Sequence, residues 1–416
     1  MKNQLLPIFI LSIWVASVSC SPESEQAPLE PNLRTLEIHE TKTVNASTEF
    51  AIDLFHQLNK SGRINQFYSP YSIHMALSMT MNGNEGEVFE EFLNFLRFED
   101  QTRDEANKGA KELTEFLLEV DPRVQLAITN AIWYRQDYQV QAAFKKLSEQ
   151  FYNAEVAGID VADPKSVRII NDWIENQTKG RIKDMLDQVP ADAVMYLVNA
   201  IYYKADWRYP FDAAKTAKEA FHTSAHQHVS VDMMTLKEAA PIRIFQNDVF
   251  QYIDIPYSTG QYSMGILLPH DYDLSVVEDH LTSDNLSLWR SQAVEQNIIL
   301  KMPKFKLKQK IENLRDDLIE MGLESPFFAT DKNFTLLFEN PTDPLEISRV
   351  IHDAVIEVDE KGTEAAAATV VEIRELSAMP SGPKTVVIDR PFIFFIQEKH
   401  SGAILFLGRL GDPSAL

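Results

Sequence analysis

Side chains that could do chemistry are present in this chain, but they do not fall into a catalytic pattern. His222, His226 and His228 stand close together, and imidazole nitrogens are common metal ligands. No acidic or cysteine ligand shares their spacing, so a polar surface loop is the favoured interpretation and we expect no metal site. The sequence has no Gly-x-Ser-x-Gly turn, no His-Glu-x-x-His pair and no glycine-rich phosphate loop. We therefore expect a protein that is not an enzyme and that needs no cofactor.

The one cysteine follows an apolar segment at the amino terminus. Lys2 precedes an apolar run from Leu5 to Val18, which is short for a membrane span and stands where an export signal would. Lipid attachment at Cys20, as in bacterial lipoproteins, is the first interpretation; the alternative is ordinary signal cleavage, with Cys20 removed or left as a free thiol. In both cases residues 1–19 are predicted to be a signal peptide. The mature chain is then exported, secreted or held in the cell envelope, and does not rely on disulfides.

Composition predicts a large folded body behind a linker. The 416 residues are 45% hydrophobic and 24% charged, which is enough for one large core. The 61 acidic residues outnumber the 39 basic ones, and a net charge of -22 makes nucleic acid and anionic polysaccharide poor partners. Residues 20–45 are polar, include Pro28 and Pro31, and are expected to form a flexible linker. Residues 46–416 are then a single domain.

Apolar periodicity predicts where helices and strands lie. Helical spacing predicts a helix from Ser47, capped by Ser47 or Thr48 and closed by Gly62, and further helices after Pro70, over 87–120, near 169–174 and over 311–321. Alternation or dense β-branched content predicts strands near 65–68, 124–132, 194–203, 252–256, 262–269, 298–307, 385–396 and 403–407. Helices early and strands late indicate an α+β fold around a large, mostly antiparallel sheet.

The rest of the chain is organised around one unusual stretch, Asp359 to Thr369, in which charged residues lead into Gly362 and then into four consecutive alanines. Alanines favour a helix, and the Pro- and Gly-containing segment beyond favours a loop. A period of two indicates a half-buried strand instead, because it places small or β-branched residues on one face: Thr363, Ala365, Ala367, Thr369, Val371 and Ile373. The stretch is therefore compatible with loop, helix and strand.

Several motifs in a fixed order give this chain a family resemblance. From about Asn45 to Pro413 it resembles the serpins. The matching segments are Asn65-Gln-Phe-Tyr-Ser-Pro-Tyr-Ser, Leu197-Val-Asn-Ala-Ile-Tyr-Tyr-Lys with Trp207, Pro210 and Phe211, Val231-Asp-Met-Met, Met302-Pro-Lys-Phe, the segment from His352 to Thr369, and Asp389-Arg-Pro-Phe-Ile-Phe-Phe-Ile. The resemblance implies an α+β serpin fold with three β-sheets, eight to nine helices and an exposed reactive-centre loop at about residues 360–384.

The resemblance also implies a mechanism. A target protease cleaves the loop as a substrate, the freed hinge inserts as a new strand into the central sheet, and the protease stays trapped as an acyl-enzyme. The small, uncharged face of the hinge fits this role, since it can enter a packed sheet without burying charge. The implied function is suicide-substrate inhibition of serine endopeptidases. The alternatives are a non-inhibitory carrier, chaperone or storage serpin, and an inhibitor of cysteine proteases.

The family's spacing places the reactive bond at Leu376-Ser377. Leu376 would enter the primary pocket of a chymotrypsin-, cathepsin-G-, subtilisin- or elastase-like serine protease. A shift of one or two residues would present Glu375 to a glutamyl protease, or Ser377 to a protease with a small pocket. The implied hinge comprises Glu360, Gly362, Thr363, Glu364, Ala365, Ala366, Ala367, Ala368 and Thr369.

The resemblance also implies two polar clusters, at positions of this chain that match the family's motifs. The first, which we call the shutter cluster, lies under the sheet where its strands part and comprises Ser69, Ser72, Asn199 and His352. The second, the breach cluster, lies where the loop enters and comprises Trp207, Lys304 and Glu360, with a salt bridge between Lys304 and Glu360.

Some positions depart from the family's commoner choices. Ala205, Asp206 and Asp353 stand where glycine and basic residues are more usual, and we expect them to influence sheet opening. The region after Gly86 lacks the basic face of heparin-activated members, so no heparin cofactor is expected. We expect a monomer whose partner is a serine protease.

Overall fold

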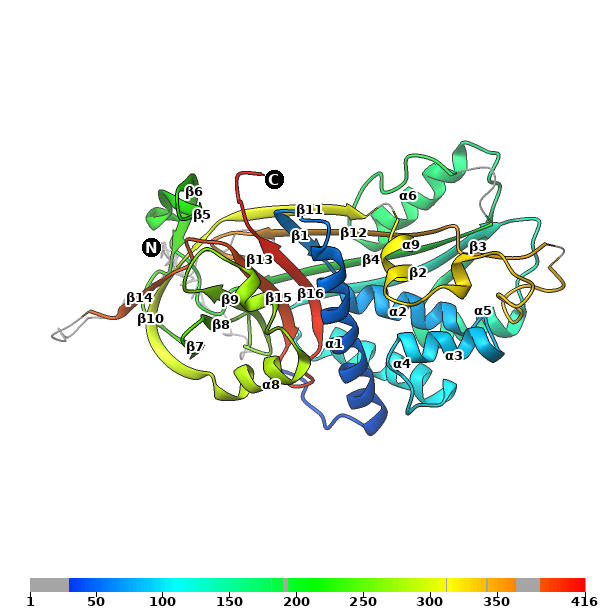
Figure 1. Ribbon diagram of the computed structural model, residues 1–416, viewed down its shortest axis with the longest axis horizontal. Coiled ribbons are helices and arrows are strands. Elements are labelled where there is room, and N and C mark those ends of the chain that lie inside the picture. Colours follow the sequence, from blue (N-terminus) through cyan, green and yellow to red (C-terminus); the bar gives the residue numbers. More distant parts are fainter. Residues whose placement is uncertain are drawn as a thin grey trace, which may run out of the picture.

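The computed structural model describes residues 30–180, 182–189, 194–311, 313–341, 343–363 and 382–415. Within these ranges the chain forms nine α-helices, and short 3₁₀ turns at Ala213–Lys215 and Ser325–Phe327 (Figure 1). The α-helices are α1 (Ile38–Asn59), α2 (Pro70–Met81), α3 (Gly86–Phe95), α4 (Arg103–Glu119), α5 (Ala142–Tyr152), α6 (Lys165–Gln177), α7 (Ser275–Glu278), α8 (Ser283–Gln292) and α9 (Arg315–Glu320).

Six strands form the central sheet. Their order across it is β11 (Phe305–Ile311), β12 (Arg349–Val358), β13 (Gly362–Thr363), β4 (Met195–Asp206), β2 (Gln125–Arg135) and β3 (Glu155–Ile159). β4 is buried along nearly its whole length, as its continuous apolar run predicts for a strand covered on both faces. It runs parallel to β12, so β13 lies antiparallel to both of its neighbours.

Ten further strands are joined in one hydrogen-bonded network. Nine follow the order β1 (Asn65–Tyr68), β16 (Ile404–Leu410), β15 (Phe392–Glu398), β9 (Tyr262–Pro269), β8 (Phe250–Pro256), β7 (Ala240–Gln246), β10 (Val294–Pro303), β6 (Gln227–Thr235) and β5 (Ala217–Ser224), and β14 (Lys384–Val387) pairs with β10. β10 is the junction, because its first half pairs with β7 and its last residues pair with β6. Divided at β10, the network is two sheets, which with the central sheet makes three.

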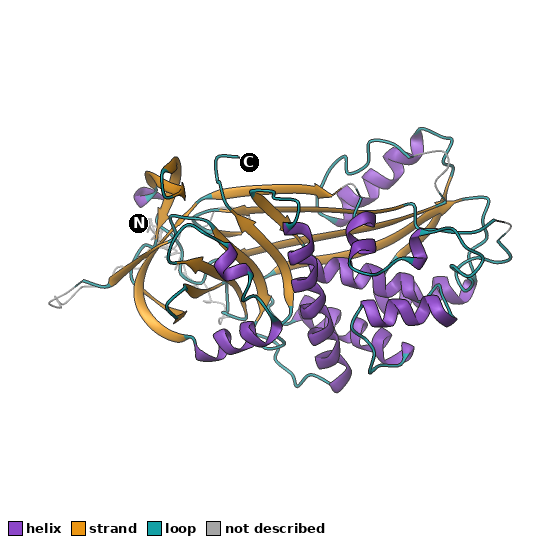
Figure 2. Cartoon of the chain, viewed as in Figure 1, coloured by secondary structure: helices purple, strands orange, loops and turns teal. Residues whose placement is uncertain are grey.

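The central sheet is covered on both faces. α6 lies on one face, where Ile170 and Ile174 pack on β2, β4 and β12, and α1 to α4 lie on the other side (Figure 1). Helices surround one end of the body, whereas the other end is built mostly of strands (Figure 2). α2 has all 12 residues buried, in keeping with a helix that is apolar on every side. No helix in the described ranges is long and apolar enough to cross a bilayer.

Most predicted elements are present, but several boundaries were wrong. α1 begins at Ile38 rather than Ser47, and its cap is a capping box of Glu37 and Glu40, so residues 38–45 are helical and not linker. The predicted strand 298–307 divides at Lys304 into β10 and β11. β11 continues to Ile311, which shortens the predicted helix 311–321 to α9. The predicted strand 385–396 also divides, because residues 388–391 belong to no strand.

Candidate functional site

The central sheet is forked between β4 and β12. At one end the two strands pair directly, from Tyr196–Arg349 to Ala200–Asp353. At the other end β13 stands between them, with Thr363 opposite Ala205 and Val358. Between these two regions, residues 201–204 of β4 and 354–357 of β12 have no recorded pairing with each other in the described part of the chain. The sheet is therefore closed at one end and holds the start of the predicted hinge at the other.

Gly362 is fixed in the fork by the closeness of the neighbouring backbone. A Cβ atom at this position would lie 2.1 Å from the carbonyl oxygen of Ala205 and 2.6 Å from Cα of Asp206. No side chain fits such a gap, so glycine is needed for β13 to reach β4. The Asp359 carboxylate accepts hydrogen bonds from the backbone N–H groups of Lys361 and Gly362 and so shapes the turn between β12 and β13.

Thr363 is already part of the sheet. It is buried, and its hydroxyl lies 2.6 Å from the phenolic oxygen of Tyr257, which follows β8 and is itself buried. Tyr257 in turn stacks on Trp207, with ring centroids 4.3 Å apart. The predicted inserting face thus makes its first buried contact here.

The structure brings the three residues of the breach cluster together around the turn between β12 and β13. Lys304 Nζ lies 2.9 Å from one carboxylate oxygen of Glu360, and the hydroxyl of Thr216 donates to the other at 2.8 Å. Burial acts to raise the pKa of Glu360, but the hydrogen bonds outweigh it and hold that pKa below its ordinary value. The hydrogen bond between Lys304 and Glu360 also raises the pKa of Lys304. The pair therefore stays charged at neutral pH and connects the residue after β10 to the start of the hinge, in the turn between β12 and β13.

Trp207 holds the turn between β12 and β13 in place through hydrogen bonds to its backbone. Its indole N–H donates to the carbonyl of Asp359 at 2.9 Å, and its backbone N–H donates to the carbonyl of Lys361 at 2.6 Å. The backbone N–H of Phe211 donates to the carbonyl of Glu360 at 2.9 Å. The start of the hinge is therefore held in place by main-chain hydrogen bonds as well as by the Lys304–Glu360 ion pair.

The shutter cluster contains two hydrogen-bond chains, which are joined where the backbone N–H of Ser72 donates to the Ser69 hydroxyl. In the first, the backbone N–H of Ser69 donates to Nε2 of His352 at 2.9 Å, and the Ser69 hydroxyl donates to the carbonyl of Leu405 at 2.6 Å. Nε2 is thus an acceptor, which places the imidazole proton on Nδ1, for which no partner is found among the described residues. Burial lowers the pKa of His352 to about 3, so the ring is neutral at physiological pH.

In the second chain, the Ser72 hydroxyl donates to the Asn199 side-chain carbonyl, and the Asn199 amide donates to Oδ1 of Asn130 at 2.7 Å. Asn199 and His352 are also register partners on β4 and β12. The four predicted shutter residues are therefore gathered at the closed end of the fork and are all buried. Ser69 also caps α2, so the cluster fixes the first turn of that helix.

Three residues of this site were missed from sequence. Asn130 lies on β2 opposite Asn199, Tyr257 covers Thr363, and Thr216 supports Glu360. The Asn130 position could have been found, because a buried amide inside an apolar strand needs a partner. Nothing in the sequence around Tyr257 or Thr216 indicates a role in this site, because their partners are 106 and 144 residues away.

The rest of the predicted site lies outside the described residues. This applies to the hinge from Glu364 to Thr369, to the reactive bond Leu376-Ser377 and to Cys20. His222 and His228 face each other across the β5–β6 hairpin, with His226 in its turn. No cluster of three metal-ligating side chains occurs in the described ranges.

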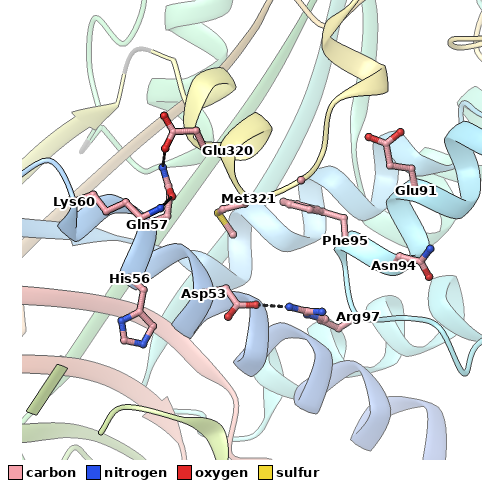
Figure 3. A pocket seen from close by; sticks show the side chains of 11 residues that line it. Asp53, His56, Gln57, Lys60, Glu91, Asn94, Phe95, Arg97, Glu320 and Met321 are labelled. Carbon is pink, nitrogen blue, oxygen red and sulfur yellow. Dashed lines mark hydrogen bonds and ion pairs between the residues drawn. The ribbon is translucent and has the colours of Figure 1, made fainter. Parts of the chain in front are cut away.

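A surface pocket between α1, α3 and α9 offers no catalytic arrangement. It measures about 560 Å³, and its walls include an Asp53–Arg97 ion pair and a Gln57–Glu320 hydrogen bond (Figure 3). Its 11 lining residues include His56 but no serine, threonine or cysteine that this ring could activate.

Comparison with known proteins agrees with this arrangement. The family model "Serpin (serine protease inhibitor)" matches residues 45–413. The chain is 33% identical to human Serpin B4 over 390 residues, covering 88% of this chain and 98% of the relative. It is 32% identical to an uncharacterized serpin-like protein of Methanosarcina acetivorans over 379 residues, covering 88% and 87%.

Solved structures share the fold. Human thyroxine-binding globulin complexed with thyroxine has a TM-score of 0.82 at 27% identity, covering 90% of this chain and 99% of that one. Serpin48 of the insect Tenebrio molitor has a TM-score of 0.80 at 26% identity, covering 91% and 100%. From the family model, the relatives and these structures together, the chain belongs to the serpin family.

Proposed function

We propose that this protein is a suicide-substrate inhibitor of serine endopeptidases that is cleaved at about Leu376-Ser377. The observation that supports it best is the fork itself, in which Gly362 and Thr363 already pair as a strand between β4 and β12. Insertion of the cleaved hinge then continues an existing strand, so the costly first contact between hinge and sheet is made before cleavage.

The two strands of the fork, β4 and β12, are open over the same length, which also supports insertion. From Ala205 to Ala200 on β4 and from Val358 to Asp353 on β12, each strand advances by five positions from its β13 pair to its closed pair. A hinge that continues in antiparallel register from Thr363 therefore advances equally along both strands, without a bulge. The sequence Glu364 to Ala368 supplies small side chains for this stretch, apart from one glutamate.

The test uses the mature protein and a chymotrypsin-like protease. We expect a complex that survives a denaturing gel, and a much higher melting temperature for the cleaved protein, because insertion adds a strand to the central sheet. A variant with Thr363 replaced by arginine is expected to be cleaved without trapping the protease. Cleavage of the unmodified protein with neither a covalent complex nor a raised melting temperature would overturn the inhibitory function.

A non-inhibitory carrier is the second candidate, because a carrier of thyroxine is among the similar structures. Proteins of this family are mostly protease inhibitors, yet some bind small molecules instead. If the protein is a carrier, we expect the opposite result in the same experiment, namely cleavage with no trapped protease. A cysteine protease such as papain, run in parallel, tests the remaining alternative.

The target class depends on the residue that enters the protease pocket. With Leu376 before the reactive bond, we expect proteases that prefer large apolar residues to be trapped. Mass spectrometry of the released carboxy-terminal fragment identifies the bond. A fragment that begins at Ser377 supports the assignment, whereas one that begins at Leu376 or Ala378 moves it to Glu375 or Ser377.

We also propose that residues 1–19 direct export and that Cys20 is lipidated. The supporting features are the short apolar run and the position of the one cysteine of the chain two residues after it. Detergent-phase partitioning of the exported protein tests the anchor. Partitioning that is lost in Cys20→Ser supports lipidation, and partitioning that survives this substitution overturns it.

A further inference from the structure

Asp353 occupies the last closed position of the fork. It pairs with Ala200, and no pairing between β4 and β12 is recorded beyond this point until β13. Continuing the β13 register by five residues brings Ala368 opposite both Ala200 and Asp353. The Ala200–Asp353 pair is therefore the first closed pair that an inserting hinge has to separate.

The Asp353 side chain is poorly accommodated in the closed sheet. It is 1% exposed, and neither carboxylate oxygen has a hydrogen-bond partner within the described structure. Its strand neighbour Ile351 packs in the apolar layer under α6, together with Ala200 and Ile174. A buried carboxylate without hydrogen bonds is unfavourable when charged and tolerable when protonated.

We propose that the Asp353 carboxyl is a proton-controlled gate for strand insertion: in its charged form it weakens the closed Ala200–Asp353 pair and speeds insertion, and in its protonated form it keeps the sheet shut. This rests on the proposed function, since it concerns the same insertion step. When Ala368 arrives, the position beside Asp353 is taken by a methyl group, and the separated strands admit water to the carboxylate.

The surroundings of Asp353 contain few charges that could replace the missing hydrogen bonds. On β11, Lys310 is its register partner, and Lys308 lies one step further along the same face. The ammonium of Lys310 bonds Asp187, in the segment after α6, at 2.8 Å. α6 itself presents the apolar Ile170 and Ile174.

The other titratable groups nearby lie further along the strands. On the same face they are Arg349 and Glu357 of β12, Lys306 of β11, and Tyr196, Tyr202 and Lys204 of β4. His352 is adjacent in sequence but faces the opposite side, toward Ser69. Burial raises the pKa of Asp353 to about 6, even though Lys308 and Lys310 act to lower it.

The sign of the effect follows from proton linkage. Above pH 6 the closed sheet holds a charged Asp353, whereas near pH 5 the closed sheet binds a proton that a hydrated carboxylate would release. The pH of 5 is one unit below this pKa. The increase in insertion rate that the charged carboxylate gives is therefore about tenfold smaller at pH 5 than at pH 7.5. Protonation of other groups is shared by wild type and variant, so the ratio of their rates isolates Asp353.

The experiment measures insertion of a synthetic peptide with the sequence from Thr363 to Ile373 into the uncleaved protein, by native gel and by the rise in melting temperature. Wild type and Asp353→Asn are compared at pH 7.5 and pH 5. We expect the ratio of the wild-type rate to the variant rate to fall about tenfold at pH 5. Glu87→Gln, which removes an exposed acid of α3 paired with Lys332 and lies outside the fork, is the matched control and is expected to follow wild type.

Each outcome decides the proposal. A ratio that does not change with pH, with insertion present, overturns the gate and leaves the inhibitory function standing. Absence of peptide insertion in every protein at both pH values overturns the gate and the proposed insertion mechanism together. If Asp353→Asn does not fold, Asp353→Ala provides the same comparison, since it also carries no titrating group.

Discussion

Tyr257 and Thr363 face each other in the interior of the protein, with their side-chain oxygens 2.6 Å apart. Both residues are buried, so neither hydroxyl has solvent as an alternative partner. The contact joins the first residue of the inserting face to a residue that also stacks on Trp207. The described start of the hinge is thus already in contact with the residues that surround the fork.

Replacing Thr363 by arginine is expected to turn the proposed inhibitor into a substrate. A buried, unpaired guanidinium cannot be accommodated beside Tyr257, so β13 leaves the fork and insertion loses its starting strand. The measurement is the fraction of protein that forms a gel-stable complex with a chymotrypsin-like protease, which should fall at least tenfold. Thr363→Ser keeps the hydroxyl and serves as control. Unchanged complex formation by the arginine variant would contradict the role given to this residue.

Gly362→Ala is expected to destabilise the native fold by about 1–3 kcal/mol, because its Cβ would overlap the backbone of Ala205 and Asp206. Urea unfolding at neutral pH measures the loss. The matched control is Gly382→Ala, since a Cβ there meets nothing within 4 Å and a change within about 0.5 kcal/mol is expected. Equal stability of the two variants would show that β13 does not need the close approach.

The Lys304–Glu360 ion pair is expected to stabilise the closed site by about 1 kcal/mol or less. Glu360 is 15% exposed and is also held by Thr216, whereas the Lys306–Glu357 pair has the same 2.9 Å distance but both of its side chains are more exposed. Double-mutant cycles with glutamine at each position, read by urea unfolding, should give a larger coupling energy for the first pair. A larger coupling for Lys306–Glu357 would oppose this ranking.

His352 is expected to make the native state lose stability as the pH falls. Its pKa is about 3 in the folded protein and about 6.5 when exposed, so the unfolded chain takes up a proton first as the pH falls through 6.5. Between pH 7.5 and pH 5 this costs about 2 kcal/mol, and the loss continues until about pH 3.

The His352 effect is measured by urea unfolding of wild type and His352→Gln at both pH values. Glutamine can still accept the hydrogen bond of Ser69 but does not titrate, so the variant lacks this loss. Asp353 acts in the opposite direction, because its raised pKa makes the folded state bind a proton near pH 6. The comparison of variant with wild type removes that contribution. An identical pH dependence in the two proteins would mean that His352 is not buried in neutral form.

The local pattern of the sequence predicted much of the fold. Continuous apolar residues from 194 to 203 predicted a buried strand, and Ser69 before Pro70 predicted the start of α2. The motif match also named the residues of the breach and shutter clusters. Errors arose at boundaries. The start of α1 was missed because polar residues 38–45 hide a helix whose buried face is fixed by contacts with distant parts of the chain.

The sequence by itself determined that this chain is a member of the serpin family and that its hinge offers one small, uncharged face. Only the tertiary structure decided that Gly362 and Thr363 pair between β4 and β12, that Tyr257 is the partner of Thr363, and that Asp353 stands at the last closed pair. The physical reason is that these properties depend on the register between strands more than 100 residues apart and on burial. Neither is set by the residues next to Thr363 or Asp353 in the chain.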